Sequence, residues 1–288
     1  MNTQIDNRIK KASLTETEKK VAEYISKNFV SVCAMSALAL GEKIGTSDTS
    51  VIRTARKLGF TGYSQMQDFI TGTMQEEIAN SGGINFLPPA ARLDKKRDQM
   101  KAPDLYQQVM SKINHNIGTI FDKNSEDAFT DAAGIIFSSK RRFVMGFRGC
   151  AGVAHLLGGC LSDVFTDVHT VIDADSRAIG EMMDITQDDC LIVISYPRYA
   201  HMVYTAIEIA GKAHAKIIVL TDKLTAPINR FSDVVLLSEV DSATINNSYV
   251  APNVIVEILL AAVHKNLGKK EKARLEELER YISENGLF

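Results

Sequence analysis

The feature that most constrains the fold of this chain is a series of short apolar runs in its second half. The runs cover residues 142–146, 168–172, 190–195, 216–221 and 234–237. The central runs, such as Leu191-Ile192-Val193-Ile194, are apolar without alternation, which is the pattern of parallel strands covered on both faces. Helix-length stretches separate the first four runs, whereas the last connection is shorter and non-helical. The pattern predicts an α/β fold, a doubly wound domain with a five-stranded parallel sheet.

The first 78 residues differ, since they read as short helices with almost no strand signal. Thr15 and Glu18 form a predicted capping box at the start of one helix, whose apolar side extends to Phe29. Two short helices are predicted at 36–44 and 48–58, and a further helix carries apolar residues at helical spacing from Met66 to Ile78. This region is therefore predicted to be an all-helical domain.

The segment 38–60 indicates a helix-turn-helix. Gly41 is small enough for two helices to approach closely, and Gly45 can adopt the positive φ that a tight turn needs. Either Ser47 or Asp48 can cap the second helix, whose outer face then carries hydroxyls and cations. Hydroxyls near a helix N-terminus suit phosphate or base edges, and arginine suits guanine or phosphate. The predicted residues for binding double-stranded operator DNA are Ser47, Thr49, Ser50, Arg53 and Lys57.

The overall charge does not by itself indicate nucleic acid. The chain has 33 Lys and Arg against 35 Asp and Glu, so its formal net charge is −2. Any DNA binding must come from the local motif and depend on dimerisation. The alternative is that this is an ordinary small helical domain with a few exposed cations.

The region between the two patterns is predicted to be a linker over residues 79–104. It contains Gly82-Gly83 and Pro88-Pro89, which loosen the backbone and end helices. The charge run 92–101 is interpreted as solvated linker in preference to a phosphate-contacting arm. The predicted domains are 1–78 and 105–288, and the apolar helices 106–121 and 254–265 are candidate surfaces for a homodimer or homotetramer.

Three strand ends in the second domain indicate a small-molecule pocket, because ligands of doubly wound sheets sit beyond the carboxyl ends of the strands. Small residues follow the first strand from Gly146 to Gly152, and polar residues follow the third and fourth. Arg148 and Arg198 can hold a carboxylate or phosphate through paired hydrogen bonds. Alternatively, each arginine pairs with a local acid such as Asp222 or Asp173. The predicted ligand-binding residues are Arg148, Cys150, Ser195, Arg198, Tyr199, Thr221 and Asp222.

Several of these motifs together resemble the RpiR/MurR family of bacterial transcriptional regulators. The resemblance rests on the Leu14-Thr15 helix start, on Leu40, Gly45, Ser47 and Val51-Ile52-Arg53, and on 56–60 followed by Gly62-Tyr63. It implies an N-terminal helix-turn-helix domain followed by a sugar-isomerase (SIS) domain, and covers nearly the whole chain. It also implies a regulator of carbohydrate metabolism that senses a phosphosugar or sugar acid. The sequence departs from the family at Cys150, where a serine is usual, and at Arg148, where a glycine is usual.

An enzyme is the main alternative to a regulator. A sugar-phosphate isomerase would need a general base, for which His201 is the best candidate and Glu181 and Glu257 follow. None of these residues forms a local acid–base motif, so no catalytic residue is predicted. A protein-binding scaffold is a third interpretation, but it leaves the glycine-rich strand ends without a purpose.

The cysteines and the chain start bear on cofactors and location. Cys33, Cys150, Cys160 and Cys190 form no CxxC pair, which argues against a zinc site, and no cofactor is expected. The first residues are polar and no apolar run is long enough to span a membrane. A cytoplasmic protein is therefore predicted.

Overall fold

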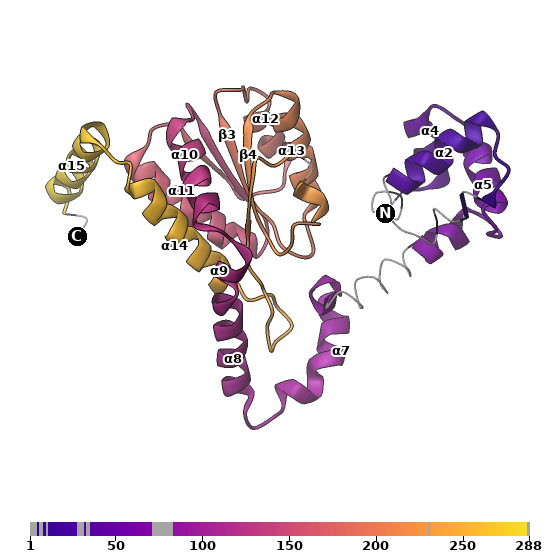
Figure 1. The fold of residues 1–288 in the computed structure, drawn as a ribbon, viewed down its shortest axis with the longest axis horizontal. Helices are drawn as coiled ribbons and strands as arrows, with labels where there is room; N and C mark the ends of the chain where they lie inside the picture. Colours follow the sequence, from indigo (N-terminus) through magenta and orange to yellow (C-terminus); the bar gives the residue numbers. More distant parts are fainter. Residues whose placement is uncertain are drawn as a thin grey trace. The chain divides into compact units, whose positions relative to one another are not determined.

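The computed structural model describes residues 5, 8–9, 11–27, 32, 35–70, 83–229 and 231–286. The chain divides into two compact units, Met1–Ile84 and Asn85–Phe288. Each is described by itself, and both are drawn in Figure 1. The predicted helix positions Phe29, Met74 and Ile78 lie outside the described residues.

The first unit is helical, as predicted. Its helices are α2 (Glu16–Lys27), α4 (Ala37–Ile44), α5 (Asp48–Lys57) and a helix over 63–70. The capping box is present, because the backbone N–H of Thr15 donates to Glu18 Oε2 over 2.8 Å. The apolar sides of these helices meet in one core, which includes Val21, Ile25, Leu40, Val51, Ala55, Met66 and Ile70.

Helices α4 and α5 form the predicted helix-turn-helix. Gly45 ends α4 with φ of 75°, a left-handed conformation that favours glycine. A Cβ atom on Gly41 would lie 2.8 Å from the carbonyl oxygen of Thr46, so only glycine permits this close approach. Of the two candidate caps, Ser47 is the one used, since its hydroxyl accepts from the backbone N–H of Ser50.

The second unit is built on a five-stranded parallel sheet in the order β2-β1-β3-β4-β5. The predicted α/β fold class is confirmed. The strands are β1 (Arg142–Gly146), β2 (Val168–Val171), β3 (Cys190–Ile194), β4 (Lys216–Thr221) and β5 (Val234–Leu237). The strand order reverses direction between β1 and β3, which makes their carboxyl ends the switch point of the sheet.

Helices cover both faces of the sheet (Figure 1). One face packs against α10 (Glu126–Ser138), α11 (Cys150–Val164) and α14 (Val250–His264), and the other against α12 (Ser176–Met182) and α13 (His201–Lys212). Alternate residues of one strand serve the two cores: Ile192 and Ile194 face the first set of helices, whereas Leu191 and Val193 face the second. Helix α14 buries one side in this core, which accounts for much of its apolar sequence. Its role as an assembly surface stays a prediction.

The remaining elements flank this core. The predicted helix 106–121 is interrupted at Thr119, where α8 ends and α9 begins. Among the described residues no single helix is long and apolar enough to cross a membrane. Helices α14 and α15 reach that length and composition only together, and the pair is bent by 116°. The other elements are α8 (Leu105–Gly118), α9 (Ile120–Lys123), α15 (Lys269–Glu284) and the 3-10 turns η1 (Gly83–Phe86) and η2 (Pro227–Asn229).

The segment predicted to be a solvated linker is different in the structure. Residues Pro89–Met100 form helix α7, and the two-unit division places them with the second unit. Arg92 and Lys96 of this helix are buried, with 6% and 5% of their surface exposed. The interpretation of the charge run as solvated was therefore wrong at these two positions, because both cations hydrogen-bond to carbonyl groups of the second unit. The boundaries 1–78, 79–104 and 105–288 stay a prediction.

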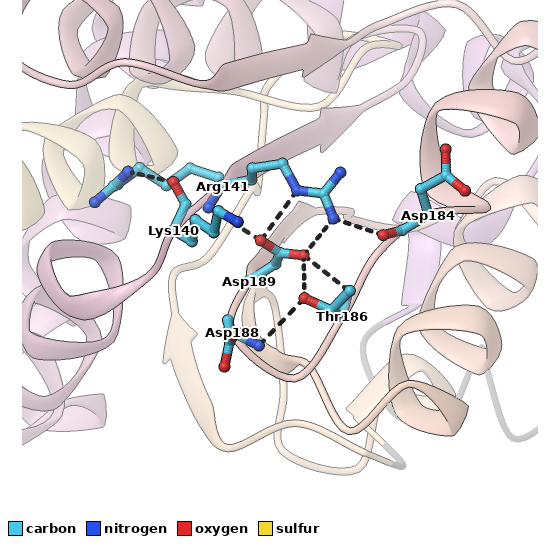
Figure 2. A network of polar contacts seen from close by, with 7 residues as sticks. Lys140, Arg141, Asp184, Thr186, Asp188 and Asp189 are labelled. Atoms are coloured by element: carbon cyan, nitrogen blue, oxygen red, sulfur yellow. Dashed lines mark hydrogen bonds and ion pairs between the residues drawn. The ribbon is translucent and has the colours of Figure 1, made fainter.

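A polar network at the amino ends of β1 and β3 is structural (Figure 2). Arg141 binds both carboxylate oxygens of the buried Asp189, at 3.1 Å and 2.7 Å, and Thr186 also donates to Asp189. Burial of Asp189 opposes its ionisation, but these hydrogen bonds outweigh burial and hold its pKa at about 2. The network ties the loop before β3 to β1 at the edge opposite the carboxyl ends of the strands.

Candidate functional site

The predicted DNA-binding residues lie together on and just before α5. Ser47, Thr49, Arg53 and Lys57 are exposed and Ser50 is half-buried. The opposite side of α5 is buried through Val51, Thr54 and Ala55. These five side chains therefore form one accessible face at the N-terminal half and outer side of the second helix of the motif.

The two cations on this face share a partner that was not predicted from the sequence. The carboxylate of Glu18, on α2, is only 1% exposed and lies 3.0 Å from Nε of Arg53 and 2.8 Å from Nζ of Lys57. The contact with Lys57 is a hydrogen bond, whereas the contact with Arg53 is an ion pair without hydrogen-bond geometry. The side chains of Arg53 and Lys57 remain 58% and 39% exposed, so each contacts Glu18 and is also accessible to solvent.

The second unit contains a cavity of about 220 Å³ at the carboxyl ends of β1 and β3. This is the switch point at which doubly wound sheets bind ligands. The loop after β1 contributes Phe147 and Arg148, the loop after β3 contributes Ser195 to Arg198, and the loop before α14 contributes Ile245 to Asn247. The cavity is therefore formed by loops from three parts of the second unit together with the start of α7.

The charges around the cavity are of one sign. Three arginines line it (Arg92, Arg148 and Arg198), and the lining includes no Asp or Glu. No ion pair to any of the three is present among the described residues. The positive charge of Arg198 adds to the effect of burial in lowering the pKa of Arg92. The cavity is thus a site of uncompensated positive charge, which favours an anion.

Four helices also begin at the cavity. Pro89 of α7, Cys150 of α11, Ala200 before α13 and Tyr249 before α14 all line it. None of these helices has a side-chain cap at its N-terminus. Pro89 has no N–H group, and the N–H groups of Cys150 and Ala151 already donate to the carbonyls of Phe147 and Arg148. The contribution of these helices to the cavity is therefore the partial positive charge of their dipoles. The backbone and the arginines therefore favour the same kind of ligand.

The cavity brings together four of the seven predicted ligand residues, Arg148, Cys150, Ser195 and Arg198. Tyr199, Thr221 and Asp222 do not line it. The hydroxyl of Tyr199 donates to Asp222 over 2.5 Å, and the ring of Tyr199 packs edge-on against Phe86. The suggestion that Asp222 pairs with an arginine is wrong, because among the described residues its side chain is bound by Tyr199 and Thr221.

Sequence reasoning missed part of the lining. Arg92 belongs to the charge run assigned to the linker, and Asn246, Asn247 and Tyr249 follow the last strand, whose end was not interpreted as part of a pocket. A signal for this loop was available, since Asn246-Asn247-Ser248 is polar and directly precedes an apolar helix. Nothing in the periodicity of the charge run points to burial of Arg92.

Two contacts fix the shape of the cavity wall. A Cβ atom on Gly149 would lie 2.3 Å from the hydroxyl oxygen of Tyr249, so the ring can take its place only against glycine. Cys150 is buried beside it, and burial raises the pKa of the thiol. Arg148 has φ of 57°, at the position where the family usually has glycine. Its backbone therefore adopts the left-handed conformation that favours glycine, and its side chain adds a charge to the cavity lining.

Comparison with known proteins identifies both units. A helix-turn-helix domain model of the rpiR family matches residues 1–77, and a SIS domain model matches residues 135–262. The chain is 24% identical over 241 residues to the HTH-type transcriptional regulator RpiR of Escherichia coli, covering 80% of this chain and 74% of that protein.

This chain belongs to the RpiR family. It is a helix-turn-helix transcriptional regulator with a SIS domain, as the resemblance implied. Two solved structures share the fold. The sugar isomerase domain of the RpiR transcription factor from Sphaerobacter thermophilus matches with a TM-score of 0.59 and 23% identity, over 62% of this chain and 99% of that one. The NanR protein of Vibrio vulnificus, solved in complex with ManNAc-6P, matches with a TM-score of 0.51 and 14% identity, over 97% of both chains.

Proposed function

We propose that the SIS domain of this RpiR-family regulator binds a small anionic sugar derivative in the cavity at β1 and β3, and that binding changes the affinity of the helix-turn-helix for operator DNA. The observation that carries the proposal is the convergence of three arginines and four uncapped helix N-termini on a cavity without acidic lining. A phosphate or carboxylate group accepts from the arginines and is attracted by the positive ends of the helix dipoles.

The remaining lining fits the rest of such a ligand. Ser195, Asn246 and Tyr249 offer hydroxyl and amide groups that can bind sugar hydroxyls, and Phe147 offers an apolar surface. A protein of this fold, NanR, has been solved with a sugar phosphate, ManNAc-6P, which supports a ligand of the same class here. The class is a phosphosugar or sugar acid.

On the DNA side, we propose that Thr49, Ser50 and Arg53 face a groove of the duplex, with Ser47 and Lys57 near phosphates. A single motif with so few cations makes few phosphate contacts, so two copies are needed for specific binding. The regulator is then a homodimer or homotetramer on a palindromic site, with half-sites roughly 34 Å apart or a multiple of that. As a DNA-binding regulator it acts in the cytoplasm.

The cavity lining argues for sensing over catalysis. An isomerase needs a general base near the substrate, and the cavity lining contains no His, Asp or Glu. The best sequence candidate, His201, lies at the exposed start of α13 and is not part of the lining. Burial raises the pKa values of Cys150 and Tyr249, so both groups stay protonated at neutral pH and cannot accept a proton from a substrate.

A thermal-shift screen of sugar phosphates and sugar acids tests the proposal. A ligand at 100 times its Kd adds about 2.7 kcal/mol of stability. Arg198→Ala should abolish the shift, whereas Arg177→Ala, which removes an exposed arginine paired with Asp175 on another part of the domain, should leave it intact. Conversion of a ligand to product would favour the isomerase instead, and equal shifts for Arg198→Ala and the unchanged protein would refute the assigned site.

A further inference from the structure

Helix α7 is attached to the second unit in an unusual way. The two side chains that it buries are cations, Arg92 and Lys96, one turn apart on the same side of the helix. Lys96 donates to the carbonyls of Ser242 and Thr244. No carboxylate forms an ion pair with either cation within the described parts of the chain. The helix is therefore held by neutral acceptors that solvate two buried charges without neutralising them.

Arg92 joins three parts of the structure. Its Nε donates to the carbonyl of Leu87 and its Nη2 to that of Asn85, in the segment that leads into α7. Its Nη1 donates to the carbonyl of Ile245 and to the side chain of Asn247, which both belong to the loop that closes the cavity. Arg92 is also part of the cavity lining. One charged group thus fastens the start of α7 to the cavity wall.

The acceptors of Arg92 leave room for a ligand. Four of its five N–H groups are used by these four bonds, and the last hydrogen on Nη2 has no acceptor among the described residues. Arg198 and Arg148 line the same cavity, so an empty cavity holds like charges near one another. A bound anion would compensate this charge and accept from the free N–H group.

This arrangement makes anion binding and α7 docking interdependent. The anion meets the full positive charge of the cavity only when Arg92 is in place, so it binds more tightly to the docked state of α7. By linkage, the bound anion favours docking by the same factor. A contact that involves no charge, the packing of Phe86 on Tyr199, also joins the segment before α7 to the rest of the second unit.

We propose that Arg92 is an effector contact through which an anion in the cavity locks the start of α7 onto the second unit. In sequence, α7 follows the segment that joins the helix-turn-helix unit to the SIS domain. Whether α7 is docked on the SIS domain therefore determines the point at which the connecting segment leaves that domain. The inference rests on the proposed anion-binding function of the cavity and names the residue that transmits it.

Hydrogen exchange of the full-length protein, measured with and without inorganic phosphate and with glucose as the uncharged control, tests this inference. Phosphate should slow exchange in the cavity loops 147–150 and 195–198 and also in α7. Couplings of this kind change an equilibrium by roughly 5- to 150-fold, which sets the expected range for α7. Glucose should change neither region.

Three variants separate the possible outcomes. In Arg92→Ala, phosphate should still protect the cavity loops but should no longer protect α7. In Arg92→Lys, phosphate should protect α7 less than in the unchanged protein. The control Arg97→Ala changes an exposed arginine of the same helix, paired with Asp94, and should behave like the unchanged protein. Arg92→Lys is the conservative variant in case Arg92→Ala does not fold, because lysine retains the charge but not the forked set of donors.

The results distinguish failure of the inference from failure of the proposed function. Protection of the cavity loops without any change in α7 of the unchanged protein would overturn the role of Arg92 and leave the anion site intact. Equal protection of α7 in Arg92→Ala would also overturn it. Absence of protection in both regions would overturn the anion site, and the inference with it.

Discussion

Replacing Glu18 with glutamine tests whether the buried carboxylate under the recognition helix stabilises the first unit. The substitution keeps the shape of the side chain and removes the charge beside Arg53 and Lys57. A hydrogen bond to a charged group contributes about 1.5–3 kcal/mol, whereas an exposed ion pair contributes about 0.2–1 kcal/mol. Because both cations are more than a third exposed and regain hydration, we expect a loss of about 1–2 kcal/mol at neutral pH.

Thermal unfolding of the full-length protein, followed by hydrogen exchange of peptides from the first unit, measures this loss. Each 1 kcal/mol shifts the Tm of a domain of 60–100 residues by roughly 4–8 °C, and the unit spans Met1–Ile84. Glu42→Gln is the matched control, since it makes the same change of charge at an exposed position on α4. The control should leave the free energy of unfolding of the unit within about 0.5 kcal/mol of that of the unchanged protein.

The pH dependence sharpens the test. The hydrogen bond from Lys57, followed by that from the backbone of Thr15, lowers the pKa of Glu18 from 4.5 to about 2. A lowered pKa in the folded state gives a stability contribution that is complete above pH 4.5 and is lost as the pH falls towards 2. The difference between the unchanged protein and Glu18→Gln should therefore close over this window. No difference at neutral pH, or a difference that persists to pH 2, would show that the charge of Glu18 does not stabilise the first unit.

Three further predictions concern other parts of the molecule. Arg53→Ala should weaken operator binding by about 1–3 kcal/mol and relax specificity at one base pair if Arg53 reads a base; in a binding titration, an equal loss on all sequences would assign it to phosphate instead. Gly149→Ala should displace Tyr249 and weaken phosphate binding in a calorimetric titration, whereas Gly152→Ala, at which a Cβ meets nothing, should not; equal affinities would contradict this packing. Asp189→Asn should destabilise the second unit above pH 3.8, with the difference in urea midpoint closing towards pH 2 because the pKa of Asp189 is lowered; a difference independent of pH would disprove the ion pair.

Most of the fold was predictable because hydrophobic pattern and turn chemistry dictate it locally. The strand 142–146 was predicted with the bounds that the structure gives to β1, and 216–221 with those of β4. Gly41 and Gly45 were predicted from the steric needs of a tight turn, which depend on few residues. The charge run at 92–101 was not predictable in the same way, because the burial of Arg92 depends on carbonyls that lie about 150 residues away.

The candidate sites were predictable to the extent that they follow strand and helix ends. Arg148 and Ser195 could be placed in the cavity because the carboxyl ends of β1 and β3 meet at the switch point. The suggested pairing of Asp222 with an arginine was wrong, because a strand end gives the position of a side chain but not its partner. The contact of Glu18 with Arg53 joins α2 to α5, and the capping box explained this glutamate without any need for a second role.

The linkage between the cavity and the operator is the claim on which the regulator account depends. Two titrations of the full-length protein test it most directly. The first measures the affinity for a selected operator duplex with and without the sugar phosphate or sugar acid found by thermal shift. The second measures the affinity for that ligand with and without operator. If the cavity and the operator site are linked, both affinities change by the same factor, roughly 5- to 150-fold, and Arg198→Ala removes both changes. A ligand that fills the cavity and leaves operator affinity unchanged would contradict this linkage.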